Sequence, residues 1–281
     1  MAKTTRFLIL GDMHGKMPHV YAKKYDAVIA VGDFCSDAPR KWIFEAMKKR
    51  MENPRYHKEW TDLVGKKKAK KMMEKQWQDG RKTLTRLNQL GKWTFIVPGN
   101  WDFAEEGMWH LLHVDLDNLI DCHARAIETD HLVFIGYGVN SGPEIPLGRR
   151  PTNKKERAAM ARFLEMSRYF DKLFRGAKKA RKPVIFISHN VPYGTGLDLI
   201  TDRRSPLLGE HAGSVLARRI IEKWQPLACI GGHMHEHFKA EKIGKTLCVN
   251  AGFGTHVNVV MDVKGKKVAA LNFLKDGKRV K

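Results

Sequence analysis

Short apolar runs recur along the chain, and each one ends at a glycine or a polar residue. The runs hold four or five residues rich in β-branched side chains, which is typical of buried strands in α/β proteins. Ligands of open α/β sheets bind outside the carboxyl ends of the strands. We therefore expect the polar residues after these runs to lie together at one edge. The predicted strands are residues 7–10, 27–31, 93–97, 184–187 and 227–230.

A long segment between the second and third predicted strands has helical periodicity instead. Met73, Trp77, Leu84 and Leu87 recur at helical spacing within residues 40–92. The segment contains 17 Lys and Arg residues against 6 Asp and Glu residues. This pattern predicts two or three helices that form one basic helical insertion.

A second basic helix is predicted from about Asn153 to Arg175. It lies within residues 149–182, which hold 13 basic and 3 acidic residues. Beyond it, alternating apolar and polar positions predict antiparallel hairpins that close a second sheet. Glycines separate the predicted hairpin strands, which are residues 238–243, 245–250, 256–263 and 266–273.

The bulk composition sets broad limits on the class of protein. A chain of 281 residues with 43% hydrophobic residues can bury a substantial core, and we predict a single domain over residues 1–281 with the basic insertion at about 40–92. The formal net charge of +21 favours polyanions such as nucleic acid, nucleotides or an anionic membrane surface. The alternative is that the lysines only solvate the surface.

Cysteine usage and hydropathy predict where the protein resides. The four cysteines form no Cys-x-x-Cys pair, which favours a reduced, cytoplasmic protein. The apolar run at residues 7–10 is too short for a signal peptide or a membrane span, so we expect no membrane partner. The sequence predicts no particular oligomeric state.

The residues that follow the predicted strands are of metal-binding types. A mixed set of oxygen and nitrogen donors suits two borderline divalent ions such as Mn, Fe, Zn, Co or Ni. No cysteine belongs to the set, which argues against a structural zinc site. A carboxylate has two oxygens, so Asp33 could bridge two ions. The seven predicted ligands are Asp12, His14, Asp33, Asn100, His189, His233 and His235.

The order of these blocks resembles that of the calcineurin-like metallophosphoesterase superfamily, from Arg6 to about Val263 apart from the basic insertion. The matching blocks are Asp12-Met13-His14, Gly32-Asp33, Gly99-Asn100, His189 and Gly232-His233-Met234-His235. The residues from Ser188 to Thr195, with Leu197-Asp198 and His211-Ala212-Gly213-Ser214, are similar to small prokaryotic, especially archaeal, phosphoesterases of the Icc-like type.

The resemblance implies both a fold and a mechanism. The implied fold is a four-layer α/β/β/α sandwich of two mixed sheets flanked by helices. One divalent ion would be bound by Asp12, His14 and His235, and a second by Asn100, His189 and His233. Asp33 would bridge the two ions, and a shared hydroxide would attack the phosphorus atom. Of the candidate metals, we favour manganese.

The chain departs from the family pattern at Trp101. The family usually has histidine after the Gly-Asn pair, and that histidine is thought to assist the leaving group. Tryptophan cannot donate a proton as an acid. The enzyme would then favour esters with good leaving groups, or Asp102 or His211 would substitute, or activity would be low and the protein would bind without catalysis.

The motifs, the missing histidine and the basic charge together predict a phosphoester hydrolase. We expect phosphodiesters of nucleotide or nucleic-acid type as substrates, with residues 40–92 and 149–182 as candidate nucleic-acid contacts. The catalytic candidates are Asp33, Asn100, Asp102 and His211. The alternatives are a phosphomonoesterase, a nucleotide pyrophosphohydrolase and a non-catalytic binding scaffold on the same fold.

Overall fold

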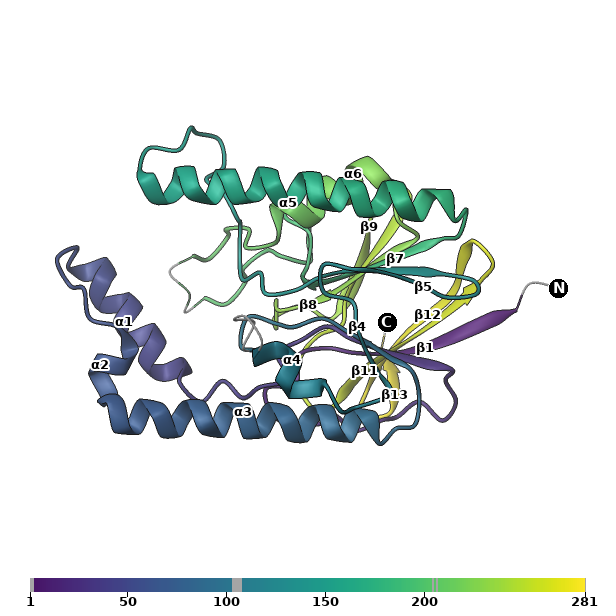
Figure 1. Cartoon of the computed structure of the whole chain (residues 1–281), viewed down its shortest axis with the longest axis horizontal. Coiled ribbons are helices and arrows are strands. Elements are labelled where there is room, and N and C mark those ends of the chain that lie inside the picture. Colours follow the sequence, from purple (N-terminus) through teal and green to yellow (C-terminus); the bar gives the residue numbers. More distant parts are fainter. Residues whose placement is uncertain (1–2, 103–107, 204, 206, 281) are drawn as a thin grey trace.

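Two β-sheets pack face to face, and helices cover the outer face of each (Figure 1). This arrangement confirms the predicted four-layer α/β/β/α sandwich. The computed structural model describes residues 3–102, 108–203, 205 and 207–280. No helix within these ranges is both long enough and apolar enough to cross a membrane.

One sheet has seven strands in the order β13-β12-β11-β1-β2-β3-β4. Neighbouring strands from β1 to β4 pair in parallel, and β11 pairs with β1 antiparallel. The carboxyl ends of β1, β2 and β3 therefore meet at one edge. The strands are β1 (Thr4–Leu10), β2 (Ala27–Ala30), β3 (Thr94–Ile96), β4 (Leu119–Asp121), β11 (Val257–Lys264), β12 (Lys267–Lys275) and β13 (Lys278–Val280).

The other sheet has six strands in the order β5-β6-β7-β8-β10-β9. Its central strands β6, β7, β8 and β10 are parallel, and the two edge strands are antiparallel to their neighbours. The strands are β5 (Ala126–Glu128), β6 (Val133–Tyr137), β7 (Val184–Asn190), β8 (Ala228–Gly232), β9 (Lys239–Ile243) and β10 (Thr246–Asn250).

The prediction that the C-terminal hairpins close one second sheet is wrong. The first hairpin, β9–β10, joins the six-stranded sheet beside β8, whereas the second, β11–β12, joins the seven-stranded sheet beside β1. The buried residues Val259, Met261 and Val263 of β11 contribute to the core between the sheets from that position. The chain therefore passes from one sheet to the other between β10 and β11.

Side-chain alternation along the strands fills three separate cores. In β1, Phe7 and Ile9 point between the sheets, and Leu8 and Leu10 point to the helices outside. This is the period of two expected of a strand buried on both faces. Between the sheets, Phe95 of β3 stacks on Phe134 of β6, with ring centroids 3.7 Å apart.

The helices form the two outer layers. The seven-stranded sheet is covered by the carboxyl half of α3 (Lys66–Asn88), through Leu84 and Leu87, and by α4 (Met108–His113). The helices α1 (Arg40–Glu52) and α2 (Trp60–Val64) project beyond the sheets (Figure 1). The six-stranded sheet is covered by α5 (Lys154–Lys179) and α6 (Val215–Trp224). The basic segment thus contains three helices, within the range predicted.

Candidate metal centre

The loops that follow β1 and β2 are hydrogen-bonded to each other and carry three of the predicted ligands. The backbone N–H groups of Met13 and His14 donate to the carbonyl oxygen of Asp33 at 3.2 and 2.7 Å. Asp12, His14 and Asp33 are all buried, with exposed fractions of 1%, 7% and 1%. The backbone contacts therefore fix these side chains at one edge of the sheet.

Three predicted ligands adopt left-handed backbone conformations that side chains other than glycine rarely adopt. The φ angles are 45° at His14, 52° at Asp33 and 64° at His233. Such local strain persists only where the surrounding structure enforces it, and it concentrates at functional sites. All three residues belong to groups of ligand atoms that share Asp12 and Asp33.

Two glycines allow the loops to approach closely. A Cβ atom on Gly99 would lie 2.1 Å from Oδ1 of Asp33, and one on Gly232 would lie 2.3 Å from Oδ1 of Asp12. Any other residue at these positions would displace a carboxylate. The glycines of the Gly-Asn and Gly-His motifs therefore make room for the acidic side chains.

One group of potential metal ligands consists of Asp12, His14, Asp33 and His235, whose ligand atoms all lie within 4.8 Å of one another. Nε2 of His235 lies 3.0 Å from Oδ2 of Asp12 and 3.2 Å from Nε2 of His14. Nε2 of His14 lies 3.5 Å from Oδ2 of Asp33. Two imidazoles and two carboxylates thus converge on one point.

A second group consists of Asp12, Asp33, His189 and His233, again within 4.8 Å. Nδ1 of His189 lies 2.9 Å from the carbonyl oxygen of Val31, to which it donates, so Nε2 is the ring nitrogen that could bind a metal ion. This Nε2 lies 2.8 Å from Oδ1 of Asn100 and 3.7 Å from Oδ1 of Asp33. Asn100 therefore adds a neutral oxygen to the second group.

Burial sets the protonation of the centre. Burial, together with the neighbouring carboxylates Asp12 and Asp102, raises the pKa of Asp33 well above its ordinary value. Burial lowers the pKa of His14 to about 4 and that of His233 to about 3. Both imidazoles are then neutral near pH 7, which is the form that binds a metal ion.

Several buried polar atoms of the centre lack a hydrogen-bond partner among the residues that the structure describes. They are Oδ1 of Asp12, Nδ1 of His14 and Oδ2 of Asp33. A buried polar atom without a partner is costly, and a bound cation would satisfy the carboxylate oxygens. The donor set of carboxylates, imidazoles and one amide fits borderline divalent ions.

The structure brings all seven predicted ligands together at one edge, and Asp12 and Asp33 belong to both groups. Strand β7 runs through His189 to Asn190, so this histidine lies within the strand and not after it as predicted. The count of two ions and the role of each ligand stay predictions.

The two candidate proton donors occupy different surroundings. Both carboxylate oxygens of Asp102 accept backbone N–H groups, one from Cys35 and one from Gly99, each at 2.8 Å. These bonds favour a structural role for Asp102 in holding the loop that carries Asn100. Nδ1 of His211 lies 2.8 Å from the buried Oδ1 of Asp198. Catalysis by either residue stays a prediction.

Phe253 is a residue of the site that sequence reasoning missed. Its ring stacks on His235 with centroids 4.1 Å apart and planes at 9°, and it lies edge-on to His14 at 5.2 Å. The neighbouring Gly252 accepts a backbone hydrogen bond from Asp12 at 3.2 Å. The signal available in the sequence was an aromatic residue directly after Gly252, beside the end of the predicted strand at residues 245–250.

Residues 5–237 match a family model described as calcineurin-like phosphoesterase. A curated relative, the uncharacterised protein MJ1162 of Methanocaldococcus jannaschii, is 30% identical over 175 residues, which cover 61% of this chain and 70% of the relative. The residues matched by the family model include all seven predicted ligands.

Two solved structures have a similar fold. The protein TT1561 of Thermus thermophilus aligns with a TM-score of 0.53 and 13% identity over 98% of this chain and 100% of that chain. A Staphylococcus aureus protein assigned as a 5'-nucleotidase aligns with a TM-score of 0.50 and 14% identity, over 97% of this chain and 54% of that chain. At these identities the similarity shows the fold alone.

Proposed function

Because the chain belongs to the calcineurin-like phosphoesterase family, we propose that this metal-dependent hydrolase cleaves phosphodiesters at a centre of two divalent ions. The observation that carries the proposal is the position of Asp33, which is shared by two groups of ligand atoms and keeps Oδ2 without a hydrogen bond among the described residues. The ions would be held by Asp12, His14, Asp33, Asn100, His189, His233 and His235. Manganese is our preferred metal.

When bound, such ions act as Lewis acids toward phosphoryl oxygens and make water a stronger acid. The residues of the chain position this chemistry. The carbonyl oxygen of Val31 sets the tautomer and ring orientation of His189. The backbone N–H of His233 donates to Oδ2 of Asp12 at 2.9 Å. This bond holds the Asp12 carboxylate beside His233.

The preference for diesters is supported by position 101. Trp101 replaces a proton-donating histidine, and loss of a general acid typically costs about 10²–10⁴-fold in rate. Esters whose leaving groups need little protonation, such as aryl or nucleotide diesters, suffer least. The basic segments at residues 40–92 and 149–182 support nucleotides or nucleic acid as the substrate class.

The test compares two chromogenic esters. Purified protein with Mn²⁺ should hydrolyse bis-p-nitrophenyl phosphate faster than p-nitrophenyl phosphate, and elemental analysis should find two ions per chain. Faster turnover of the monoester would favour a phosphomonoesterase, and turnover of nucleoside diphosphates alone would favour a pyrophosphohydrolase. Absence of turnover with Mn, Fe, Zn, Co or Ni would leave the non-catalytic binding scaffold.

A further inference from the structure

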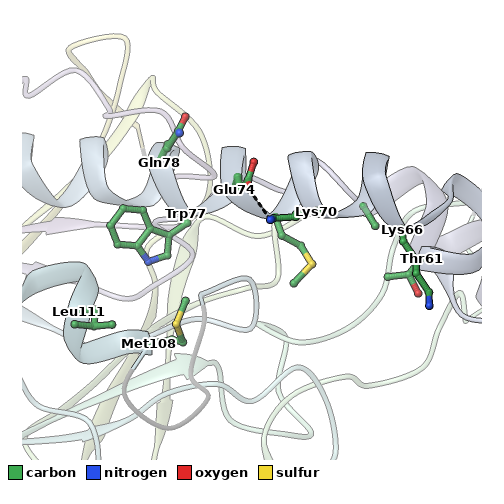
Figure 2. Close-up of a pocket in the computed structure, with 10 residues that line it drawn as sticks. Thr61, Lys66, Lys70, Glu74, Trp77, Gln78, Met108 and Leu111 are labelled. Atoms are coloured by element: carbon green, nitrogen blue, oxygen red, sulfur yellow. Dashed lines mark ion pairs between the residues drawn. The ribbon is translucent and has the colours of Figure 1, made fainter.

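An apolar groove of about 680 Å³ lies between α3 and α4. In Figure 2 the indole of Trp77 extends from α3 toward Met108 and Leu111 of α4. The exposed fractions of Met73 and Leu111 are 42% and 54%, so the groove presents apolar side chains to solvent. Its apolar residues are Ala69, Met73, Trp77, Met108 and Leu111.

The helix that forms one wall of the groove also contacts the loops that carry the predicted ligands Asp33 and His14. Nε2 of Gln76 donates to the carbonyl oxygen of Ser36 at 2.8 Å, three residues beyond the ligand Asp33. A Cβ atom on Gly15, the neighbour of the ligand His14, would lie 3.0 Å from Cβ of Asp79. The helix turn that forms the groove is therefore continuous with the turn that packs on the metal-ligand loops.

Cationic side chains border the apolar walls. Lys66 and Lys70 line the groove with Thr61, and Nζ of Lys70 lies 3.9 Å from Oε1 of Glu74 (Figure 2). Lysine stems can cover apolar surface while the ammonium groups stay in water. An occupant with both a hydrocarbon part and a negative charge would complement this surface.

We propose that the groove is a substrate subsite that binds the hydrocarbon part of an anionic phosphoester whose phosphate is cleaved at the metal centre, an inference that rests on the proposed function. The volume lies within the range of about 300–1,000 Å³ typical of small-molecule sites. Methionine side chains adapt to irregular apolar ligands. A nucleobase has polar edges that need partners, whereas five of the ten lining residues are apolar, so this groove favours a hydrocarbon group over the nucleotide and nucleic-acid substrates named above.

The first experiment measures chain-length dependence. With Mn²⁺ present, kcat/KM is determined for p-nitrophenyl alkyl phosphates whose alkyl group grows from ethyl to octyl. Each methylene buried in the groove should raise kcat/KM by about two- to fourfold. Met73→Gln and Leu111→Gln alter exposed groove residues, so both variants should fold, and each should reduce the octyl-to-ethyl ratio at least tenfold.

Met51→Gln is the matched control, because Met51 is a methionine with an exposed fraction of 68% on α1, outside the groove. This variant should keep the wild-type octyl-to-ethyl ratio. A ratio near one in the wild-type protein, or a ratio that survives both groove substitutions, would overturn the subsite.

A binding measurement separates the subsite from the proposed function. Calorimetric titration of the chelator-treated protein with octyl phosphate below its micelle concentration should show tighter binding than with ethyl phosphate. Both groove substitutions should remove the difference. If no ester is hydrolysed but this difference persists, the proposed function fails, and the groove remains a binding site for the hydrocarbon part of a phosphate ester. If diesters are hydrolysed and octyl phosphate binds no better, the subsite fails alone.

Discussion

The backbone N–H of Trp101 donates a hydrogen bond of 2.8 Å to Oδ1 of Asp33. Since the donor belongs to the main chain, a residue other than proline at position 101 can make the same bond. The indole lies edge-on to the His14 ring, with centroids 6.2 Å apart. Position 101 is therefore held at the candidate metal centre by a bond that does not depend on its side chain.

Trp101→His should restore a proton donor beside the centre. The backbone bond to Asp33 should persist, so the imidazole would replace the indole near His14. We expect kcat for a diester with a poor leaving group, such as methyl phenyl phosphate, to rise by about 10–100-fold, the lower part of the usual range for general acids. Hydrolysis of bis-p-nitrophenyl phosphate should change by less than about threefold, since p-nitrophenolate needs little protonation.

Trp101→Phe serves as the control, because it removes the indole without adding an acid. An equal rise in both variants would assign the effect to space around the centre. A rise in neither would mean that the missing histidine does not limit leaving-group departure.

Asp33→Asn should reduce activity and stabilise the metal-free protein. Mutation of a group that only orients a metal ligand typically lowers metal affinity or activity by about 10–100-fold. Loss of a carboxylate that binds the metal directly should therefore lower activity by at least about a hundredfold. Without metal, the raised pKa of Asp33 means that the folded state loses stability as pH rises through that value. The amide does not ionise and so avoids this loss, and the melting temperature of chelated protein at pH 7 should rise by about 2–4 °C.

The measurements are turnover of bis-p-nitrophenyl phosphate, metal content and calorimetric melting of chelated protein. Asp37→Asn is the control, because Asp37 follows in the same loop and lies 3.3 Å from Arg40 near the surface. Retention of wild-type activity and metal content in Asp33→Asn would contradict the bridging role.

The gathering of the predicted ligands at one edge could be predicted because several of them follow strands. Asp12, Asp33 and Asn100 come after predicted strands, and parallel strands bring their ends to one edge. The family resemblance then supplied the layering and the partition of ligands. The local pattern located Asp12, Asp33 and Asn100, whereas the assignment of ligands to each ion came from the resemblance.

Features that depend on contacts between distant segments were not predictable. Phe253 stacks on His235 only because the chain passes between the sheets after β10. The short strands β4 and β5 contain no buried residue, and no apolar run marked them in the sequence. The groove beside Trp77 forms where α3 packs near α4. Helical periodicity predicts each helix alone and does not show which helices pack together.

Nucleic-acid binding by the basic segments should depend steeply on salt. A surface that contacts six or more phosphates should lose about 10³-fold in affinity between 50 and 200 mM salt. Fluorescence anisotropy with a labelled single-stranded oligonucleotide measures the affinity at each salt concentration.

The exposed residues Lys67 and Lys71 lie on α3, and the double variant with glutamate at both positions should weaken binding. Lys275→Glu on β12 is the control. A flat salt response would leave the lysines as solvated surface.

Asp171 should stabilise the protein by joining α5 to α6. Its exposed fraction is 7%, and its carboxylate accepts hydrogen bonds of 2.8 Å from each of Arg219, Lys223 and Trp224. Burial alone would raise the pKa of Asp171. The hydrogen bonds from Arg219, Lys223 and Trp224 outweigh burial, so the pKa of Asp171 lies well below its ordinary range. Asp171→Asn leaves two cations without a counter-charge, so the free energy of unfolding at pH 7 should fall by about 1–3 kcal/mol.

The pH dependence distinguishes this charge effect from a packing defect. A carboxylate with a lowered pKa contributes its stability in full above its unfolded pKa of about 4, and that contribution is lost as pH falls through its folded value. Denaturant unfolding should therefore show a difference between wild-type protein and Asp171→Asn that is constant from pH 5 to 7 and shrinks below pH 4. The exposed Asp117→Asn should show no such difference. A difference of equal size at pH 3 and pH 7 would assign the loss to packing and not to the ion pairs.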